Sequence, residues 1–211
     1  MIISHRKKFA FFANQKTGSK AVGLVLRLSG IFDENDIMIA QPFPATRTAR
    51  INLPEYNLNE HKTHLVNHFR PKDAIEAGFI TLEQLREYDC YAFLREPEQR
   101  FLASRASMMM NRQGKIAMPG YRAGGVAPPQ HTFFFVGDEQ VVTPLDFGNY
   151  EQEIRMLLEK LGANKQMDVP EINKIFGAHM VHEIKYDPSQ HMEDILLYRQ
   201  MKDEILNRET S

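Results

Sequence analysis

The chain has little cysteine, no long apolar run and almost no net charge, and each of these shortages excludes a class of protein. One cysteine, Cys90, excludes an intramolecular disulfide framework and fits a reducing cytosol. Its place inside an apolar run predicts a buried structural thiol rather than a nucleophile. No stretch reaches the ~18 apolar residues of a membrane helix, and no secretion signal is evident. We therefore expect a cytoplasmic protein without a membrane partner.

The balance of charge also limits the kinds of partner. A formal net charge of −1 over 211 residues gives no general attraction for nucleic acid, so any anion site must be local. The chain is too short for two sizeable cores, so a single domain over residues 1–211 is expected. Apolar runs alternate with helical patterns, which predicts an α/β fold around a mainly parallel sheet.

The most informative stretch is KFAFFANQKTGSKAV, residues 8–22, in which an apolar run passes through a polar turn into a helical pattern. The phenylalanines favour a buried strand. Gly18 lets the backbone approach a ligand closely, and Ser19 is a residue type that caps helices. The helix predicted over residues 19–29 directs amides and the positive end of its dipole at an anion. Lys16 and Lys20 add full charges, so the segment is typical of a phosphate or sulfate site.

This turn does not have the sequence of a nucleoside-triphosphate P-loop. With the second glycine of G-x-x-x-x-G-K-[ST] on Gly18, the pattern needs a glycine at Ala13, and a lysine and a hydroxyl residue at Ser19 and Lys20. The lysine instead comes before the glycine. The order QKTGS over residues 15–19 resembles the 5′-phosphosulfate loop of sulfotransferases, especially those of the carbohydrate branch.

A second apolar run, over residues 90–94, ends in Arg95 and is again followed by a helical pattern. It resembles the 3′-phosphate motif of the same family, in which a strand-terminal arginine is followed by an acidic residue, a proline, a second arginine and a serine. The matching residues are Glu96, Pro97 and Arg100. The serine is displaced by one position, to Ser104, which turns a side chain by about 100° around a helix. Ser107 or a backbone amide is the alternative ligand.

The resemblance covers about residues 5–205, with looser matches in PPQ at residues 128–130 and LDFGN at residues 145–149. It implies a sulfotransferase of the short soluble bacterial and phage type, with a P-loop-like three-layer α/β/α fold. The donor would be 3′-phosphoadenosine 5′-phosphosulfate (PAPS), and the acceptor a hydroxyl or amine group, first of all on a carbohydrate. No metal is required, because the transferred group carries less charge than a phosphoryl group.

The same resemblance implies a role for each site residue. Lys16 would contact the bridging oxygen and the leaving phosphate, and Arg95 and Ser104 the 3′-phosphate. The remaining expected ligands of the 5′ end are Thr17, Gly18, Ser19 and Lys20. Basic residues in two long connections, which would meet an anionic sugar or stay in solvent, are Arg47, Arg50, Arg112, Lys115 and Arg122.

Transfer also needs a base within hydrogen-bond reach of the acceptor, and histidine is the natural candidate. His68 ends a strand predicted over residues 64–68, where open α/β sheets bind ligands, and His64 is the second candidate. An acidic base is also open. His179 and His182 are three residues apart, but no third ligand stands at a recognisable spacing, so no metal site is predicted.

The rest of the chain gives coarser predictions. The Gly/Pro-rich segment 111–130 predicts a functional lid or a disordered loop. Strands are predicted over residues 37–40, 131–136 and 141–147, and helices from Pro71, after a capping box at 81–84, over 150–161 before Gly162, and over 189–207.

Two other functions stay open at this stage. A small-molecule kinase is disfavoured by the missing Walker lysine and by the lack of a persuasive magnesium-binding acid at a strand end. The other alternative is a catalytically inactive relative that serves as a binding or structural protein.

Overall fold

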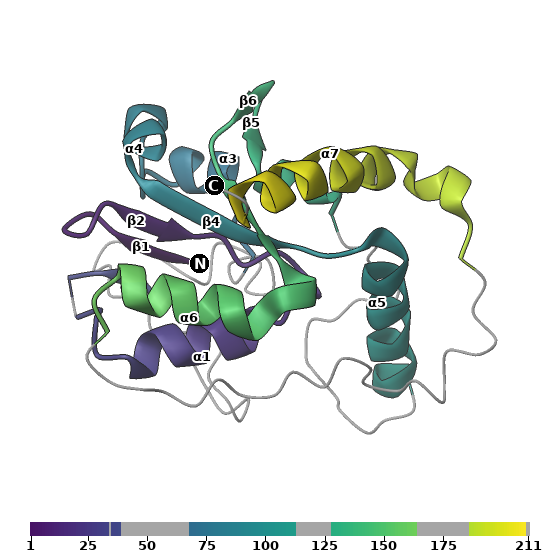
Figure 1. Cartoon of the computed structure of the whole chain (residues 1–211), viewed down its shortest axis with the longest axis horizontal. Helices are drawn as coiled ribbons and strands as arrows, with labels where there is room; N and C mark the ends of the chain where they lie inside the picture. Colours follow the sequence, from purple (N-terminus) through teal and green to yellow (C-terminus); the bar gives the residue numbers. More distant parts are fainter. Residues whose placement is uncertain (34, 39–67, 113–127, 164–185, 210–211) are drawn as a thin grey trace.

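The computed structural model describes residues 1–33, 35–38, 68–112, 128–163 and 186–209; the side chains of Lys20 and residues 106–112 lie outside that description. Within these ranges the chain forms a mixed five-stranded sheet with helices packed against it, and a separate two-stranded ribbon (Figure 1). The predicted α/β class is therefore confirmed.

The sheet has the strand order β3-β1-β2-β4-β7. Its strands are β1 (Ile2–Ser4), β2 (Phe9–Phe11), β3 (Ile37–Met38), β4 (Asp89–Leu94) and β7 (Thr143–Asp146). The pairs β2 with β4 and β4 with β7 are parallel, whereas β1 is antiparallel to both β2 and β3. The other four strands thus share one direction, and the carboxyl ends of β2, β4 and β7 meet at one edge.

Helices pack on both faces of this sheet. They are α1 (Ser19–Leu28), α3 (Pro71–Glu76), α4 (Leu82–Glu87), α6 (Tyr150–Lys160) and α7 (Met192–Glu209). Helix α5 (Pro97–Arg112) contributes no described residue to either hydrophobic core and packs against α7. Short 3-10 helices, η1 (Gln130–Phe133), η2 (Phe147–Asn149) and η4 (Pro188–His191), precede β5, α6 and α7, and β5 (Phe135–Val136) pairs with β6 (Glu139–Gln140).

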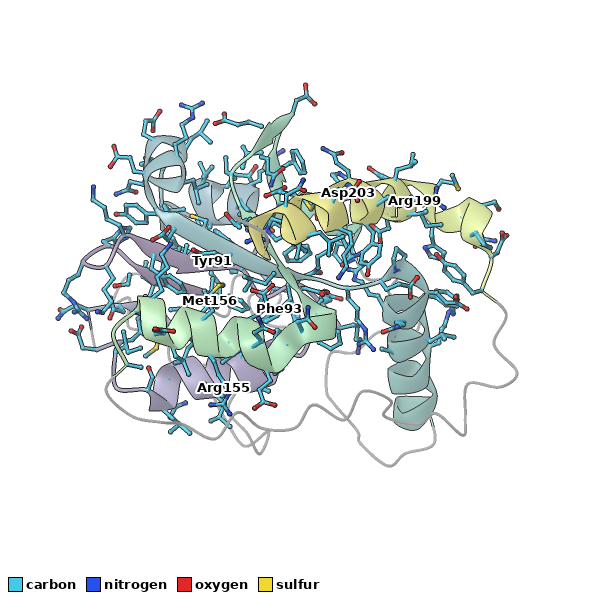
Figure 2. The ribbon with its side chains drawn as sticks, in the orientation of Figure 1. Tyr91, Phe93, Arg155, Met156, Arg199 and Asp203 are labelled. Carbon is cyan, nitrogen blue, oxygen red and sulfur yellow. The ribbon has the colours of Figure 1, made fainter. Side chains whose placement is uncertain are left out.

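Alternate residues of the central strands supply two separate hydrophobic cores, because successive side chains of a strand point to opposite faces. Tyr91 and Phe93 of β4 pack with α1 and α6, and both are labelled beside α6 in Figure 2. Ala92 and Leu94 pack on the other face with α3, α4, η1 and α7. Apolar burial on both faces is typical of a parallel sheet and explains why the run 90–94 is continuous.

Most of the predicted elements are confirmed where the structure describes them. The helix predicted at 19–29 is α1, with Ser29 as its C-cap. The capping box at α4 forms, since Gln84 N donates to Thr81 Oγ1 at 3.2 Å and Thr81 N donates to Gln84 Oε1 at 2.9 Å. Gly162 follows α6 with φ 74°. Cys90 is buried as expected, and burial, with Asp89, raises its thiol pKa to about 12.

The strand predicted over residues 131–136 is wrong in its first half. Gln130–Phe133 forms η1, and only Phe135–Val136 is a strand. Phe133 and Phe134 are both fully buried, which a turn permits and a strand exposed on one face does not. The predicted strand at 64–68, all but its last residue, and the interior of the predicted lid lie outside the described residues.

Candidate functional site

The loop between β2 and α1 contains two residues in the left-handed region of backbone conformation. Lys16 has φ 65° and Gly18 has φ 67°. Glycine adopts this conformation freely, whereas for a lysine it costs roughly 1–2 kcal/mol. We call residues 14–18 the Lys16 loop. Because it holds a strained lysine, contacts from outside the loop must maintain its shape.

Helix α1 begins directly after the Lys16 loop and has no cap from a side chain. The Gly18 carbonyl accepts from the amides of Ala21 and Val22, at 2.9 and 3.2 Å. The amides of Gly18, Ser19 and Lys20 therefore precede the first intrahelical hydrogen bond. The first turn contains no acidic residue. These amides and the helix dipole form a favourable place for an anion.

Two hydroxyl residues of the segment differ from their expected roles. The prediction that Ser19 caps α1 is corrected: Gly18 is the N-cap, because its left-handed backbone turns the chain into the helix, and Ser19 is the first helical residue. Thr17 is fully buried, and its hydroxyl donates to the Asn14 carbonyl at 2.8 Å. The Thr17 hydroxyl thus closes the loop.

Arg95 holds the strained residue of the loop in place. It directly follows β4, the parallel neighbour of β2. Its Nη1 donates to the Lys16 carbonyl at 2.7 Å, and its guanidinium carbon lies 4.5 Å from the centroid of the Phe147 ring. The side chain is 7% exposed. The arginine predicted as a ligand of the 3′-phosphate is therefore also part of the wall that shapes the Lys16 loop.

Arg100, one turn into α5, has most of its donors engaged by protein groups. Its Nε donates to the Gln15 carbonyl at 3.2 Å, and its Nη1 to Asp194 Oδ2 at 3.0 Å. Its Nη2 donates to Asn14 Oδ1 at 3.3 Å and to the Pro128 carbonyl at 2.6 Å. Since a guanidinium has five N–H donors, these four contacts make Arg100 a support of the loop more than a ligand.

Positive charge accumulates around the Lys16 amine. Burial, with the charges of Arg95 and Arg100, lowers the pKa of Lys16 to about 8. Burial, with Arg100, lowers the pKa of Arg95 to about 10, although Glu96 opposes that shift. Burial also lowers the pKa of Arg100 in spite of Asp194. Cations whose charged forms are destabilised in this way gain most from a bound anion.

A buried network of two amide side chains joins the loop to β4 and α7. Asn14 Nδ2 donates to the Phe93 carbonyl at 3.1 Å and to Gln130 Oε1 at 3.2 Å. The Gln130 side chain brackets the Arg95 backbone, with Nε2 donating to its carbonyl at 2.8 Å and Oε1 accepting from its amide at 3.1 Å. The Gln130 amide donates to Asp194 Oδ1 at 2.7 Å.

Sequence reasoning gave Asn14 and Asp194 no role, and it treated Gln130 only as part of a loosely matching segment. A polar residue directly after an apolar run was the available signal for Asn14. Nothing local marks Asp194, because its contacts are with residues 64 and 94 positions away.

The start of α5 places the remaining residues of the second motif. Both carboxylate oxygens of Glu96 cap the helix, accepting from the amides of Glu98 and Gln99 at 3.1 and 2.7 Å. Ser104 lies four residues after Arg100, so the two share one helix face, and both are buried. The displaced serine is therefore on the same side of α5 as Arg100. The Ser107 side chain lies outside the described residues.

His68 is brought next to the Lys16 loop. It lies in a turn before α3, and its Nδ1 is 2.6 Å from the Ala13 carbonyl, one residue before the Lys16 loop. A carbonyl only accepts, so Nδ1 carries the proton of the neutral ring and Nε2 is the basic nitrogen. His64 and the His179 and His182 pair lie outside the described residues, as does the Lys20 side chain.

A buried carboxylate that the sequence argument overlooked stands at the end of β7. Asp146 Oδ1 accepts from the Gly148 amide at 2.9 Å, and Oδ2 accepts from Lys202 Nζ at 2.5 Å. The Asp146 amide donates to Glu153 Oε1 at 2.7 Å. A strand-end acid is therefore present, but both of its oxygens are engaged by protein groups.

A hollow of about 450 Å³ lies away from the Lys16 loop, between His5 and the turn that joins α3 to α4. In the described ranges, no three histidine, cysteine or acidic side chains are grouped as a metal site requires. None of the helices described is both long and apolar enough to cross a membrane. Neither a family model, nor a curated protein, nor a solved structure matches this chain.

Proposed function

We propose that this protein is a sulfotransferase that moves a sulfuryl group from PAPS to a hydroxyl or amine group of an acceptor. The observation that carries the proposal is the concentration of positive charge around the Lys16 loop, where burial and the charge of Arg100 lower the pKa values of both Lys16 and Arg95. The loop also offers the first amides of α1. Cations whose charge is disfavoured by burial, together with the first amides of a helix, are suited to an anion with several charges.

The residues present fit such a donor. The amides that follow Thr17 would hold the 5′-phosphosulfate, and Lys16 would stabilise the charge that develops on the leaving phosphate. Arg95 and Ser104 would hold the 3′-phosphate. When bound, the donor supplies an activated sulfuryl group, so the protein needs to contribute position and charge rather than a covalent intermediate.

The protonation of the Lys16 amine depends on the charge of its ligand. With a pKa of about 8, its amine is mostly protonated at pH 7 and can donate to an oxyanion. A bound anion favours the ammonium form and raises this pKa. The amine is therefore more fully protonated when the site is filled than when it is empty.

His68 is the proposed base that takes the proton of the acceptor. Its Nδ1 contact with the Ala13 carbonyl fixes the tautomer and directs Nε2 as the nitrogen that accepts a proton. Because Ala13 immediately precedes the Lys16 loop, the ring and the loop keep a constant relative position. His64 stays the second candidate for this role.

The proposal also includes a P-loop-like three-layer fold, a carbohydrate acceptor and a cytoplasmic location. A P-loop-like three-layer fold is supported by the two hydrophobic cores, one on each face of the sheet. A carbohydrate acceptor is supported by the resemblance of the QKTGS and REPxxR segments to the carbohydrate branch. A cytoplasmic location is supported by the single cysteine and its buried thiol.

One observation favours a second candidate, a small-molecule kinase. Asp146 is a buried acid at the end of a parallel strand, a place from which kinases hold magnesium. In this structure its carboxylate is engaged by Lys202 and by the Gly148 amide. Magnesium binding would require the Lys202 contact to break, which makes the kinase the weaker proposal.

The decisive experiment is calorimetric titration with adenosine 3′,5′-bisphosphate, with AMP, and with ATP plus magnesium. We expect selective binding of the bisphosphate, with most of the affinity lost in Lys16→Ala and Arg95→Ala. A preference for ATP with magnesium would replace the sulfotransferase by the kinase. Binding of the bisphosphate without sulfuryl transfer to any acceptor in a glycan and phenol panel would favour an inactive relative.

A further inference from the structure

Helix α7 reaches the Lys16 loop through one carboxylate, although the two are far apart in the sequence. Asp194, in the first turn of α7, is 8% exposed. Its Oδ2 accepts from Arg100 Nη1 at 3.0 Å, and its Oδ1 accepts from the Gln130 amide at 2.7 Å. Both oxygens of a buried carboxylate are thus satisfied, as a charge in such a place requires.

Each of these two contacts leads to an arginine that holds the loop. Arg100 donates to the Gln15 carbonyl and to the Asn14 side chain. Gln130 brackets the backbone of Arg95, whose guanidinium donates to the Lys16 carbonyl. Asp194 is therefore connected to both arginines that contact the loop, directly to Arg100 and through Gln130 to Arg95.

The rigid shape of the guanidinium makes the carboxylate important for geometry as well as for charge. The five N–H donors of an arginine lie in one plane with fixed angles, so anchoring Nη1 determines where Nε and Nη2 point. Asp194 fixes Nη1, and Nε and Nη2 then meet the Gln15 carbonyl and Asn14 Oδ1. The left-handed backbone of Lys16 is one residue further on.

We propose that Asp194 is a positioning residue of the anion site: it acts through Arg100 to hold the Lys16 loop in the shape in which its amides and its amine face one ligand. This inference rests on the proposed function of the loop as an anion site.

The first test compares Asp194→Asn with Glu193→Gln. Asparagine keeps the shape of Asp194 and an acceptor for the Gln130 amide, but presents a neutral group to Arg100. Glu193 is the adjacent acid on the same helix and is exposed, with its carboxylate 2.8 Å from His131 Nδ1. By titration with adenosine 3′,5′-bisphosphate, we expect the Kd to rise about 10-fold in Asp194→Asn and by less than about twofold in Glu193→Gln.

A double-mutant cycle separates this role from a general loss of structure. If Asp194 acts through Arg100, Asp194→Asn changes the Kd by less than about twofold in an Arg100→Gln background. A full 10-fold effect in that background would overturn the proposal, as would wild-type affinity in a folded Asp194→Asn protein. Asp194→Glu keeps the charge and is expected to recover part of the affinity; the same criteria apply to it if Asp194→Asn does not fold.

Amide hydrogen exchange gives a readout that does not depend on binding. We expect the amides of residues 15–20 to exchange about 10-fold faster in Asp194→Asn, while those of α6 are unchanged. If wild type fails to bind the bisphosphate but this local change appears, the proposed ligand is wrong and the positioning role stands. Unchanged exchange at residues 15–20 would refute the positioning role whatever the ligand.

Discussion

The environment of charged side chains differs between the amino ends and the carboxyl ends of the parallel strands. We call these two ends the amino edge and the carboxyl edge of the sheet. At the amino ends of β2 and β4, charged side chains are exposed and paired, as Lys8 with Glu87 at 3.4 Å and Lys160 with Asp89 at 2.8 Å. At the carboxyl ends, Arg95 and Arg100 are buried, and burial together with neighbouring positive charge lowers the pKa values of Lys16 and Arg95. Burial also opposes the charge of Lys160, but its hydrogen bonds to Asp89 and Tyr91 outweigh this and raise its pKa.

This difference separates structural charges from functional ones. A pair whose pKa shifts favour the charged forms is complete within the protein and needs no ligand. A cation whose charged form is destabilised is kept at a cost in stability, which is typical of binding and catalytic sites. The carboxyl edge is also where parallel α/β sheets place their ligands. The lowered pKa values and the position at the carboxyl ends of parallel strands therefore both indicate the Lys16 loop as the candidate site.

The largest expected effect comes from removing the buried guanidinium of Arg100 at the carboxyl edge. Arg100→Met leaves Asp194 as a buried charge without its cation and removes the support of Asn14 and Gln15. We expect a loss of about 3–5 kcal/mol in the free energy of unfolding, measured by urea denaturation. Arg86→Gln on α4, whose pair with Glu139 is exposed, is the matched control and should leave the urea midpoint unchanged. Equal losses in both variants would contradict the contrast between the edges.

Lys16→Met is expected to stabilise the protein while it destroys the site. The pKa of Lys16 falls from 10.5 to about 8 on folding, so below pH 8 the folded chain carries a charge that it disfavours. Between pH 8 and 10.5 the unfolded chain binds the proton that the folded chain has released, so wild-type stability rises with pH across this window. The variant should be more stable by roughly 1–3 kcal/mol at pH 7 and equal to wild type above pH 10.5.

The pH dependence of unfolding checks this second prediction. Lys72→Met, which removes an exposed lysine of α3, is the control and should follow the wild-type curve. A Lys16→Met protein that is less stable than wild type at pH 7 would mean that the amine is compensated within the protein, like the lysines of the amino edge.

Sequence reasoning succeeded where a short segment determines its own structure. Gly162 supplies the left-handed residue that follows α6, and the Thr81 box starts α4. These signals depend on residues a few positions apart, so no knowledge of the rest of the fold is needed. The polar turn before α1 and the arginine after β4 were located for the same reason.

Long-range contacts account for what the sequence did not reveal. Asp194 contacts Arg100 and Gln130 only after α7 has folded back onto η1 and α5, so no local pattern identifies it. The antiparallel β1 is likewise determined by its pairing with β2 and β3 and not by its three residues. The left-handed backbone of Lys16 depends on the Arg95 contact from another strand.

A smaller effect concerns how ligand binding depends on pH. Because a bound anion favours the ammonium form of Lys16, the affinity for adenosine 3′,5′-bisphosphate should be constant well below pH 8 and weaken above it. Once the pH exceeds the free pKa, the Kd is expected to rise by up to about 10-fold per pH unit. Titrations from pH 6.5 to 9.5 check this, and the Lys16→Met protein, which has no such amine, should give a flat residual profile. A flat wild-type profile would remove the amine from the site.

The smallest expected effect tests whether the amino edge contributes only to the stability of the fold and not to ligand binding. Thr81→Ala removes the hydroxyl that accepts from the Gln84 amide at the start of α4, the helix that leads into β4. This should lower the free energy of unfolding by about 1 kcal/mol, whereas Thr81→Ser retains the cap and should lose less. Neither variant should change the affinity for the bisphosphate, because α4 makes none of the contacts that hold the Lys16 loop. If Thr81→Ala weakens binding by more than its loss of stability explains, the two edges are energetically coupled, and the division between structural and functional charge would have to be given up.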